Sequence, residues 1–117
     1  METLPKSQRL SGRSAVSALM SKGRWGFSGS LKYCYLRNEP STGANRIMVS
    51  VPKRFFKRAV KRNLLKRRMR EAYRTQKTLL APSSTDILFL YNSKNVSNFQ
   101  TIKEEVALIL KKISDEG

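Results

Sequence analysis

The 22 residues from Lys53 to Arg74 constrain this 117-residue chain more than any other stretch. They include eleven Lys or Arg residues and one acid, Glu71, so the segment carries a net charge of +10. Like charges repel at this density, and such a segment is costly to fold unless a polyanion neutralises it. The rest of the chain is basic too, which gives a total of +16 and a pI of about 10.7. The charge therefore predicts a nucleic acid as the partner.

Apolar residues recur within the basic stretch, which favours an amphipathic helix over a disordered tail. At about 100° per residue from Val60 onward, cationic and apolar side chains separate onto opposite arcs. The polar arc contains Asn63, Lys66, Arg67, Arg70 and Arg74, and the apolar arc contains Leu65, Met69, Ala72 and Tyr73. Arg62 breaks the pattern, so either the helix start is irregular or this side chain extends outward along its own stem.

Two strands are expected before this helix. Residues 31–36 and 46–51 have strand composition, and the turn-rich segment 38–45 between them predicts an antiparallel hairpin. An apolar strand follows the helix at residues 86–91 and should be covered on both faces.

Two further helices are expected near the ends of the chain. In the first, Ser11 or Ser14 would form the cap and Gly23 the stop, around an apolar face of Val16, Leu19 and Met20. The last would begin with a Ser97–Gln100 capping box and end near Lys111 and Lys112. Its apolar stripe contains Phe99, Ile102, Val106, Ile109, Leu110 and Ile113. Together these elements predict a small single-sheet α/β sandwich.

The composition favours a binding protein over a protein catalyst. There is no histidine, and the eight acids are scattered along the chain, so neither a Ser-His-Asp arrangement nor a two-metal carboxylate site is expected. Cys34, the single cysteine, should be a small buried residue. We expect Trp25, Phe27, Tyr33 and Tyr35 in the core or at its edge.

Length and hydropathy predict one domain over residues 1–117, with about the first eight residues flexible. No apolar stretch approaches the ~20 residues that a bilayer span needs, and the first residues lack the apolar core of a secretory signal. We therefore expect a cytoplasmic protein with no membrane association and no obligate protein partner.

The stretch AVKRNLLKRRMREAYR closely resembles the signature of the bacterial ribonuclease P protein component. That signature reads AV, one residue, RNR, one residue, KR, two residues, RE. The matching positions are Ala59, Val60, Arg62, Asn63, Lys66, Arg67, Arg70 and Glu71. The resemblance covers nearly the whole chain, including Arg9-Leu10, Gly23, SVPKR before the motif and Asp86 at the start of a strand.

The chain departs from the family pattern at three positions. Leu64 replaces the last arginine of RNR, which removes one phosphate contact. Val16 and Met20 replace aromatic residues that many members carry on the first helix. The apolar character of that helix is kept, but stacking of bases on its rings is not.

The resemblance implies an α+β fold in the order α-β-β-β-α-β-α, with one mixed sheet and a left-handed crossover of the basic helix. The residues alone do not resolve the third strand, although residues 49–53 could continue or bend. The implied function is that of the protein subunit of ribonuclease P. It would bind a catalytic RNA and the 5′ leader of precursor tRNA, while the RNA, with bound magnesium, removes the leader.

The family's functional residues transfer to the matching positions here. The expected RNA-binding residues are Arg54, Lys57, Arg58, Lys61, Arg62, Asn63, Lys66, Arg67, Arg70 and Arg74. The expected leader cleft contains Val16, Met20, Lys32 and Cys34. No catalytic residue and no metal site is expected in the protein alone. The alternative for Asn63 is a helix-start cap, and for the residues before the motif a solvated loop.

Other classes of protein share some of these features. A small basic ribosomal RNA-binding protein would have the same size and charge, but it has no reason to carry the spaced signature. A helix-turn-helix regulator would need a turn and a partner helix where RIMVSV predicts a strand. A membrane-surface role fits least, because the apolar face of the basic helix is small and the core needs it.

Overall fold

The computed structural model describes residues 8–38 and 44–116. Three helices and four strands follow one another in the order expected from the resemblance. They are α1 (Arg13–Lys22), β1 (Arg24–Ser28), β2 (Leu31–Arg37), β3 (Arg46–Ser50), α2 (Ala59–Arg74), β4 (Thr85–Tyr91) and α3 (Phe99–Glu116), with a short 3-10 turn, η2 (Lys77–Leu79), before β4. Seven of the first eight residues, for which flexibility is expected, and most of the turn expected at 38–45 fall outside the described residues.

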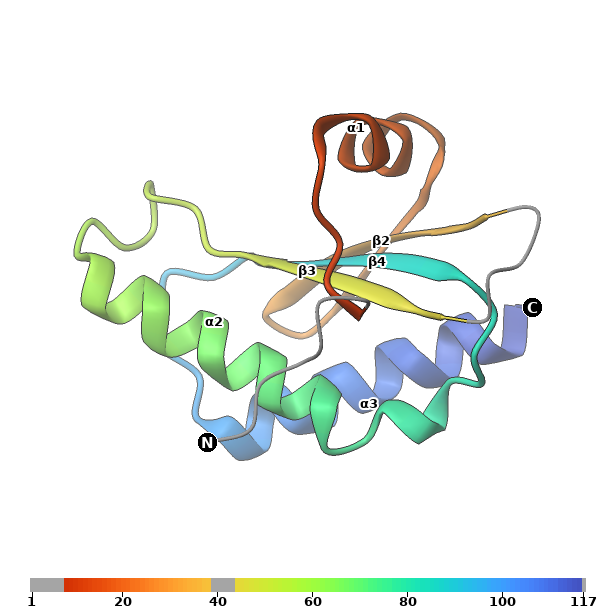
Figure 1. Cartoon of the computed structure of the whole chain (residues 1–117). Helices are drawn as coiled ribbons and strands as arrows, with labels where there is room; N and C mark the ends of the chain where they lie inside the picture. Colours follow the sequence, from red (N-terminus) through yellow and green to blue (C-terminus); the bar gives the residue numbers. More distant parts are fainter. Residues whose placement is uncertain (1–7, 39–43, 117) are drawn as a thin grey trace.

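The four strands form one mixed sheet in the order β1-β2-β4-β3. β2 pairs with β1 and β4 in antiparallel fashion, whereas β3 pairs with β4 in parallel. The parallel pair is connected through α2, and this crossover turns in the left-handed sense when followed in Figure 1. The mixed sheet and the crossover confirm the expected fold class.

The helices cover the two faces of the sheet unequally. α2 and α3 lie side by side on one face, and α1 crosses the other (Figure 1). The larger core lies under α2 and α3, where all four residues of the apolar arc of α2 are buried. A smaller cluster of Leu10, Leu19, Cys34 and Leu88 lies under α1. The large core thus holds α2 with its opposite, polar arc toward solvent.

The strand pairing corrects the expected hairpin. β2 and β3 are not neighbours, because β4 lies between them. β1, which the sequence pattern did not predict, precedes β2 in the chain and forms the actual hairpin with it. Its side toward α3 carries Gly26 and Ser28, while Trp25 and Phe27 point away from the large core. In β1 the small residues face the large core and the apolar rings face away from it, which is the inverse of the usual pattern of a half-buried strand. The hydrophobic pattern therefore did not predict this strand.

The helix ends also differ from the predicted caps. Residue Gly12 occupies the N-cap of α1, so neither Ser11 nor Ser14 caps it, but Gly23 does end this helix as expected. At α3, Asn98 accepts a hydrogen bond from the Thr101 amide at 2.9 Å, which replaces the predicted Ser97 box. α3 continues to Glu116, so its two consecutive lysines lie before the last turn.

A buried acid on α3 fastens the β1–β2 turn. The Glu105 carboxylate accepts hydrogen bonds from the Ser30 amide and the Ser30 hydroxyl, both at 2.6 Å. The Ser28 hydroxyl donates to the carbonyl oxygen of the same glutamate at 3.0 Å. Gly29 has φ +57°, and a Cβ there would lie 1.6 Å from Glu105 Oε2. The turn therefore needs glycine both for its backbone conformation and for the approach of the acid.

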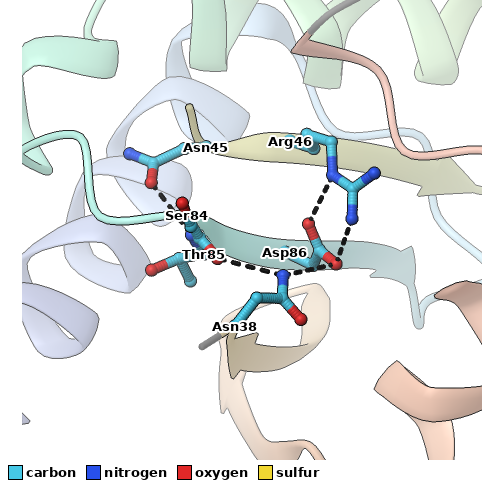
Figure 2. Close-up of polar contacts among 6 residues, drawn as sticks. All are labelled: Asn38, Asn45, Arg46, Ser84, Thr85 and Asp86. Carbon is cyan, nitrogen blue, oxygen red and sulfur yellow. Dashed lines mark hydrogen bonds and ion pairs between the residues drawn. The ribbon is translucent and has the colours of Figure 1, made fainter. Parts of the chain in front are cut away.

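A second buried acid joins the ends of three strands (Figure 2). Asp86, at the start of β4, is 2% exposed. Its carboxylate accepts two hydrogen bonds from the Arg46 guanidinium of β3, both at 2.8 Å, and one at 2.9 Å from the side-chain amide of Asn38, which follows β2. The hydrogen bonds to Asp86 raise the pKa of Arg46. Beside this pair, Asn45 Oδ1 accepts a hydrogen bond from the Thr85 amide at 3.1 Å.

We predict that Asp86→Ala lowers the free energy of unfolding by about 2–4 kcal/mol, because it leaves polar groups of Arg46 and Asn38 unpaired beside the sheet. Asp115→Ala removes an exposed carboxylate from α3 and serves as the control. Urea unfolding of both variants provides the measurement. Equal stability of the two variants would contradict a structural role for Asp86.

Candidate nucleic-acid interface

The solvent face of α2 presents a row of polar side chains without partners. Asn63, Lys66, Arg67 and Arg70 make no hydrogen bond or ion pair with any other residue in the described part of the chain. The opposite face packs in the core and fixes the orientation of the row. Because Asn63 lies one turn inside the helix and is exposed, the alternative of a helix-start cap is wrong. The row is a preformed cationic surface, which we call the α2 face.

Other cations of α2 stabilise the fold. Arg62 donates from one terminal nitrogen to the carbonyl oxygens of Phe56 and Lys57, both at 2.8 Å. The helix is regular from Ala59, and the Arg62 side chain bonds back onto the preceding loop and does not extend outward, so neither interpretation offered for this residue is correct. Arg68, which was not among the expected RNA-binding residues, donates to the Ser97 carbonyl at 2.7 Å.

Arg74, at the end of the α2 face, is held by an acid of the same helix. Its guanidinium donates to both carboxylate oxygens of Glu71, at 2.8 and 2.9 Å. This contact lowers the pKa of the Glu71 carboxyl. The only acid within the basic stretch is thus neutralised locally, and it does not reduce the positive charge around Arg67 and Arg70.

The loop before α2 extends the positive surface past the start of the helix. Lys57, Arg58 and Lys61 are exposed, and the Arg54 guanidinium lies 4.8 Å from the centre of the Phe55 ring. The loop is anchored by Phe56, which is buried and packs against Tyr91 with ring centres 5.8 Å apart. Arg54, Lys57 and Arg58 therefore project from an anchored loop, and Lys61 projects from the first turn of α2.

A second exposed surface lies beside α1, where β1 contributes aromatic rings. Trp25 is 41% exposed and Phe27 58% exposed, and neither packs against a core cluster, so the expectation that they lie in the core or at its edge is wrong. Lys32 Nζ lies 4.8 Å from the Trp25 ring centre and 5.5 Å from that of Phe27. The strand register puts all three residues on the face that carries α1. We call them the β1 platform.

The expected leader-cleft residues are only partly accessible. Met20 is 51% exposed on α1, and Val16 and Lys32 are half-buried. Cys34 is fully buried, and its thiol donates to the Leu19 carbonyl at 3.3 Å. Cys34 is therefore wrong as a residue that touches a leader. The alternation along β2 placed it on the correct face, but α1 covers it there. Tyr33 and Tyr35 are buried as expected.

No metal-ligating cluster occurs in the described residues: nowhere do three or more Cys, Asp or Glu side chains come together. The polar arrangement consists of donors and cations on one face, and of aromatic rings with a lysine on the other. Cations and amides bind phosphate, and rings stack on bases. Fold and surfaces together define a small α+β nucleic-acid-binding domain.

Comparison with known proteins specifies the class. The family model for ribonuclease P matches residues 4–114. The ribonuclease P protein component of Porphyromonas gingivalis is 33% identical over 118 residues, covering 95% of this chain and 86% of the relative. That of Chlorobaculum tepidum is 32% identical over 126 residues, covering 94% and 82%.

Solved structures agree with the fold. The ribonuclease P protein of Thermotoga maritima superposes with a TM-score of 0.74 at 24% identity, covering 89% of this chain and 96% of that one. The Staphylococcus aureus protein gives a TM-score of 0.75 at 21% identity, covering 92% and 95%. The chain belongs to the family of ribonuclease P protein components. It is a subunit of an endoribonuclease and is not itself the catalyst.

We predict that the Cys34 thiol of the folded protein resists iodoacetamide. Burial raises its pKa to about 11, so near pH 8 the thiol is protonated and poorly nucleophilic as well as covered. Mass spectrometry should show alkylation only after the protein is denatured. In a Cys34→Ala background, Met20→Cys should react at once, because position 20 is exposed. Rapid alkylation of native Cys34 would show that α1 does not cover it.

Proposed function

We propose that the α2 face binds the catalytic RNA of ribonuclease P, and that the β1 platform together with α1 carries the 5′ leader of precursor tRNA. The observation that supports the first assignment is the set of donors on α2 without internal partners, Asn63, Lys66, Arg67 and Arg70. All eight matched positions of the family signature lie on α2, and four of them are the residues of the α2 face. A helix that held its cations for stability would pair them as Arg62 and Arg68 are paired.

The side chains of the α2 face suit different parts of an RNA backbone. The planar guanidinium groups of Arg67 and Arg70 can donate two parallel hydrogen bonds to a phosphate, whereas Lys66 supplies a compact charge. Asn63 can both donate and accept, so it suits a 2′-hydroxyl or a base edge. Lys61, in the first turn of α2, would extend this contact toward the helix start, and Arg54, Lys57 and Arg58 would extend it onto the preceding loop.

Magnesium, in this proposal, is bound mainly by the RNA, which performs the hydrolysis. The chain contributes positive charge that lets RNA phosphates approach one another and the substrate. Because divalent ions screen the same phosphates, its effect on cleavage should be greatest when magnesium is scarce.

None of the described helices combines the length and hydropathy of a membrane span. We assign the chain to the cytoplasm on the basis of its RNA partners.

The β1 platform would replace the aromatic residues missing from α1. A base of a single strand can stack on Trp25 or Phe27, and Lys32 between the rings can approach the adjoining phosphate. The exposed side chain of Met20 adds an apolar contact from α1. Stacking does not depend on base identity, so this surface suits leaders of varied sequence.

We predict that Arg67→Ala with Arg70→Ala weakens binding to the catalytic RNA and reduces the magnitude of the slope of log K against log salt by roughly 1.5 to 2, because two phosphate contacts are lost. Filter binding over a range of salt concentrations measures both effects. Lys111→Ala with Lys112→Ala removes two exposed charges from α3 and is the matched control. An unchanged slope in the α2 variant, or equal slopes in both variants, would refute the assignment of the α2 face.

Magnesium dependence tests the role as a subunit. Cleavage of precursor tRNA by the catalytic RNA should gain most from the protein at low magnesium, and the gain should shrink as magnesium rises. The protein incubated with substrate and magnesium, without the RNA, should cut nothing. Accurate 5′ cleavage by the repurified protein alone would overturn the proposed division of labour.

For the leader surface, we predict that Trp25→Ser with Phe27→Ser lowers the preference for precursor over mature tRNA by about tenfold, the loss expected for one stacked base. Both rings are exposed, so circular dichroism should show an intact fold. Affinity for mature tRNA in the holoenzyme should stay the same, since mature tRNA has no leader. An equal loss for both ligands would argue against a leader-specific contact.

A further inference from the structure

A groove of about 850 Å³ separates α2 from the outer edge of the sheet. β3 is an edge strand, and Met48 and Val49 from it line one wall. Val60, Asn63, Leu64, Arg67 and Arg70 from α2 line the other. The segment that leads to α1 closes one end, where the Leu10 amide donates to the Ile47 carbonyl at 2.8 Å.

The lining of this groove is apolar where the family signature expects charge. Leu64 stands at the position of the last arginine of RNR and lies half-buried beside Met48 and Val49. One turn earlier, Val60 is 79% exposed, an unusual position for a β-branched apolar residue on a helix. Val60 and Leu64 belong to neither hydrophobic core cluster, so together they form an apolar wall on α2 that no other described part of the chain fully covers.

The rim of the groove is cationic. Arg67 and Arg70 reach it from the α2 face, and both make no hydrogen bond or ion pair with the described residues. The acid that lines the groove, Glu71, is engaged by Arg74. The lining therefore suits a small ligand in which a flat apolar part is joined directly to an anion.

We propose that this groove receives one unpaired nucleotide of the RNA bound by the α2 face, with its base against Val60 and Leu64 and its phosphate at Arg67 and Arg70. Its volume falls within the range of small-ligand pockets, roughly 300–1,000 Å³. The inference rests on the proposed function and adds that leucine at position 64 exchanges a phosphate contact for a base contact. An acidic peptide also matches the rim, but under the proposed function an RNA backbone lies on the α2 face beside the groove.

Mononucleotide titrations test the base contact directly. Protein with ¹³C-labelled methyl groups and ¹⁵N-labelled arginine is titrated with adenosine 5′-monophosphate and, separately, with ribose 5-phosphate. Both ligands should shift the guanidinium signals of Arg67 and Arg70, whereas only the nucleotide should shift the methyl signals of Val60 and Leu64. Methyl shifts of equal size with both ligands, or none with the nucleotide, would overturn the proposal.

Substitution of the apolar wall tests the contact in the complex. Val60→Ser with Leu64→Ser should weaken binding to the catalytic RNA about five- to tenfold at every salt concentration, with an unchanged salt slope, because an apolar contact is lost and no charge is removed. Val96→Ser with Leu108→Ser changes the same two residue types at exposed positions elsewhere and should have no effect.

The outcomes separate the two proposals. If the serine variant binds as tightly as the parent chain while Arg67→Ala with Arg70→Ala loses affinity and slope, the groove is not a nucleotide site but the α2 face still binds RNA. If neither variant changes binding, the proposed function itself fails. Should the double serine variant unfold, Val60→Ser alone, at a highly exposed position, decides the matter through the same methyl titration.

Discussion

The buried carboxylate of Asp86 is the contact on which the position of α2 depends. It holds Arg46 of β3 and Asn38 after β2 at the end of β4 where all three strands meet, so it helps align the parallel pair with the antiparallel one. α2 connects β3 to β4, and its two ends are therefore set by the pairing of these strands. The strands that precede and follow α2 therefore determine where its cationic surface lies.

The positive charge of the chain divides into two groups with different roles. Arg46, Arg62 and Arg68 donate to a buried acid or to backbone carbonyls, and each stabilises a strand end, a loop or a contact between elements. Lys66, Arg67 and Arg70 have no such partners in the described chain. Repulsion among the second group is the cost of the surface, and the apolar arc of α2 in the core offsets it.

The periodicity of the sequence correctly predicted the helices and strands that are fixed by burial of an apolar face. The two arcs of α2, the apolar stripe of α3 and the buried strand β4 are all present, because each buries a regular face. The strand pairing could not be predicted in this way, since β2 and β3 are separated by a strand that comes later in the chain. The sequence pattern did not predict β1, because its positions that face the large core are Gly26 and Ser28.

The candidate site was predictable to a similar degree. The signature identified the residues of the α2 face, but it did not separate Arg62, which folds back on a loop, from its exposed neighbours. The β1 platform was missed because exposed Trp25 and Phe27 look like core residues in sequence. A register that pairs Phe27 with Lys32 was the missing information, and only the β1–β2 hairpin supplies it.

The β1–β2 turn has a consequence for how the chain folds as it is synthesised. The acid that satisfies Ser30 and closes on Gly29 belongs to α3, 75 residues further along the chain. Likewise, β2 and β3 pair with opposite edges of β4, so neither pairing can form before that central strand has been made. The N-terminal half thus emerges from the ribosome without the partners that complete its sheet. The contacts that complete the sheet and orient the strongly basic α2 therefore form only after β4 and α3 have been synthesised, because both follow α2 in the chain.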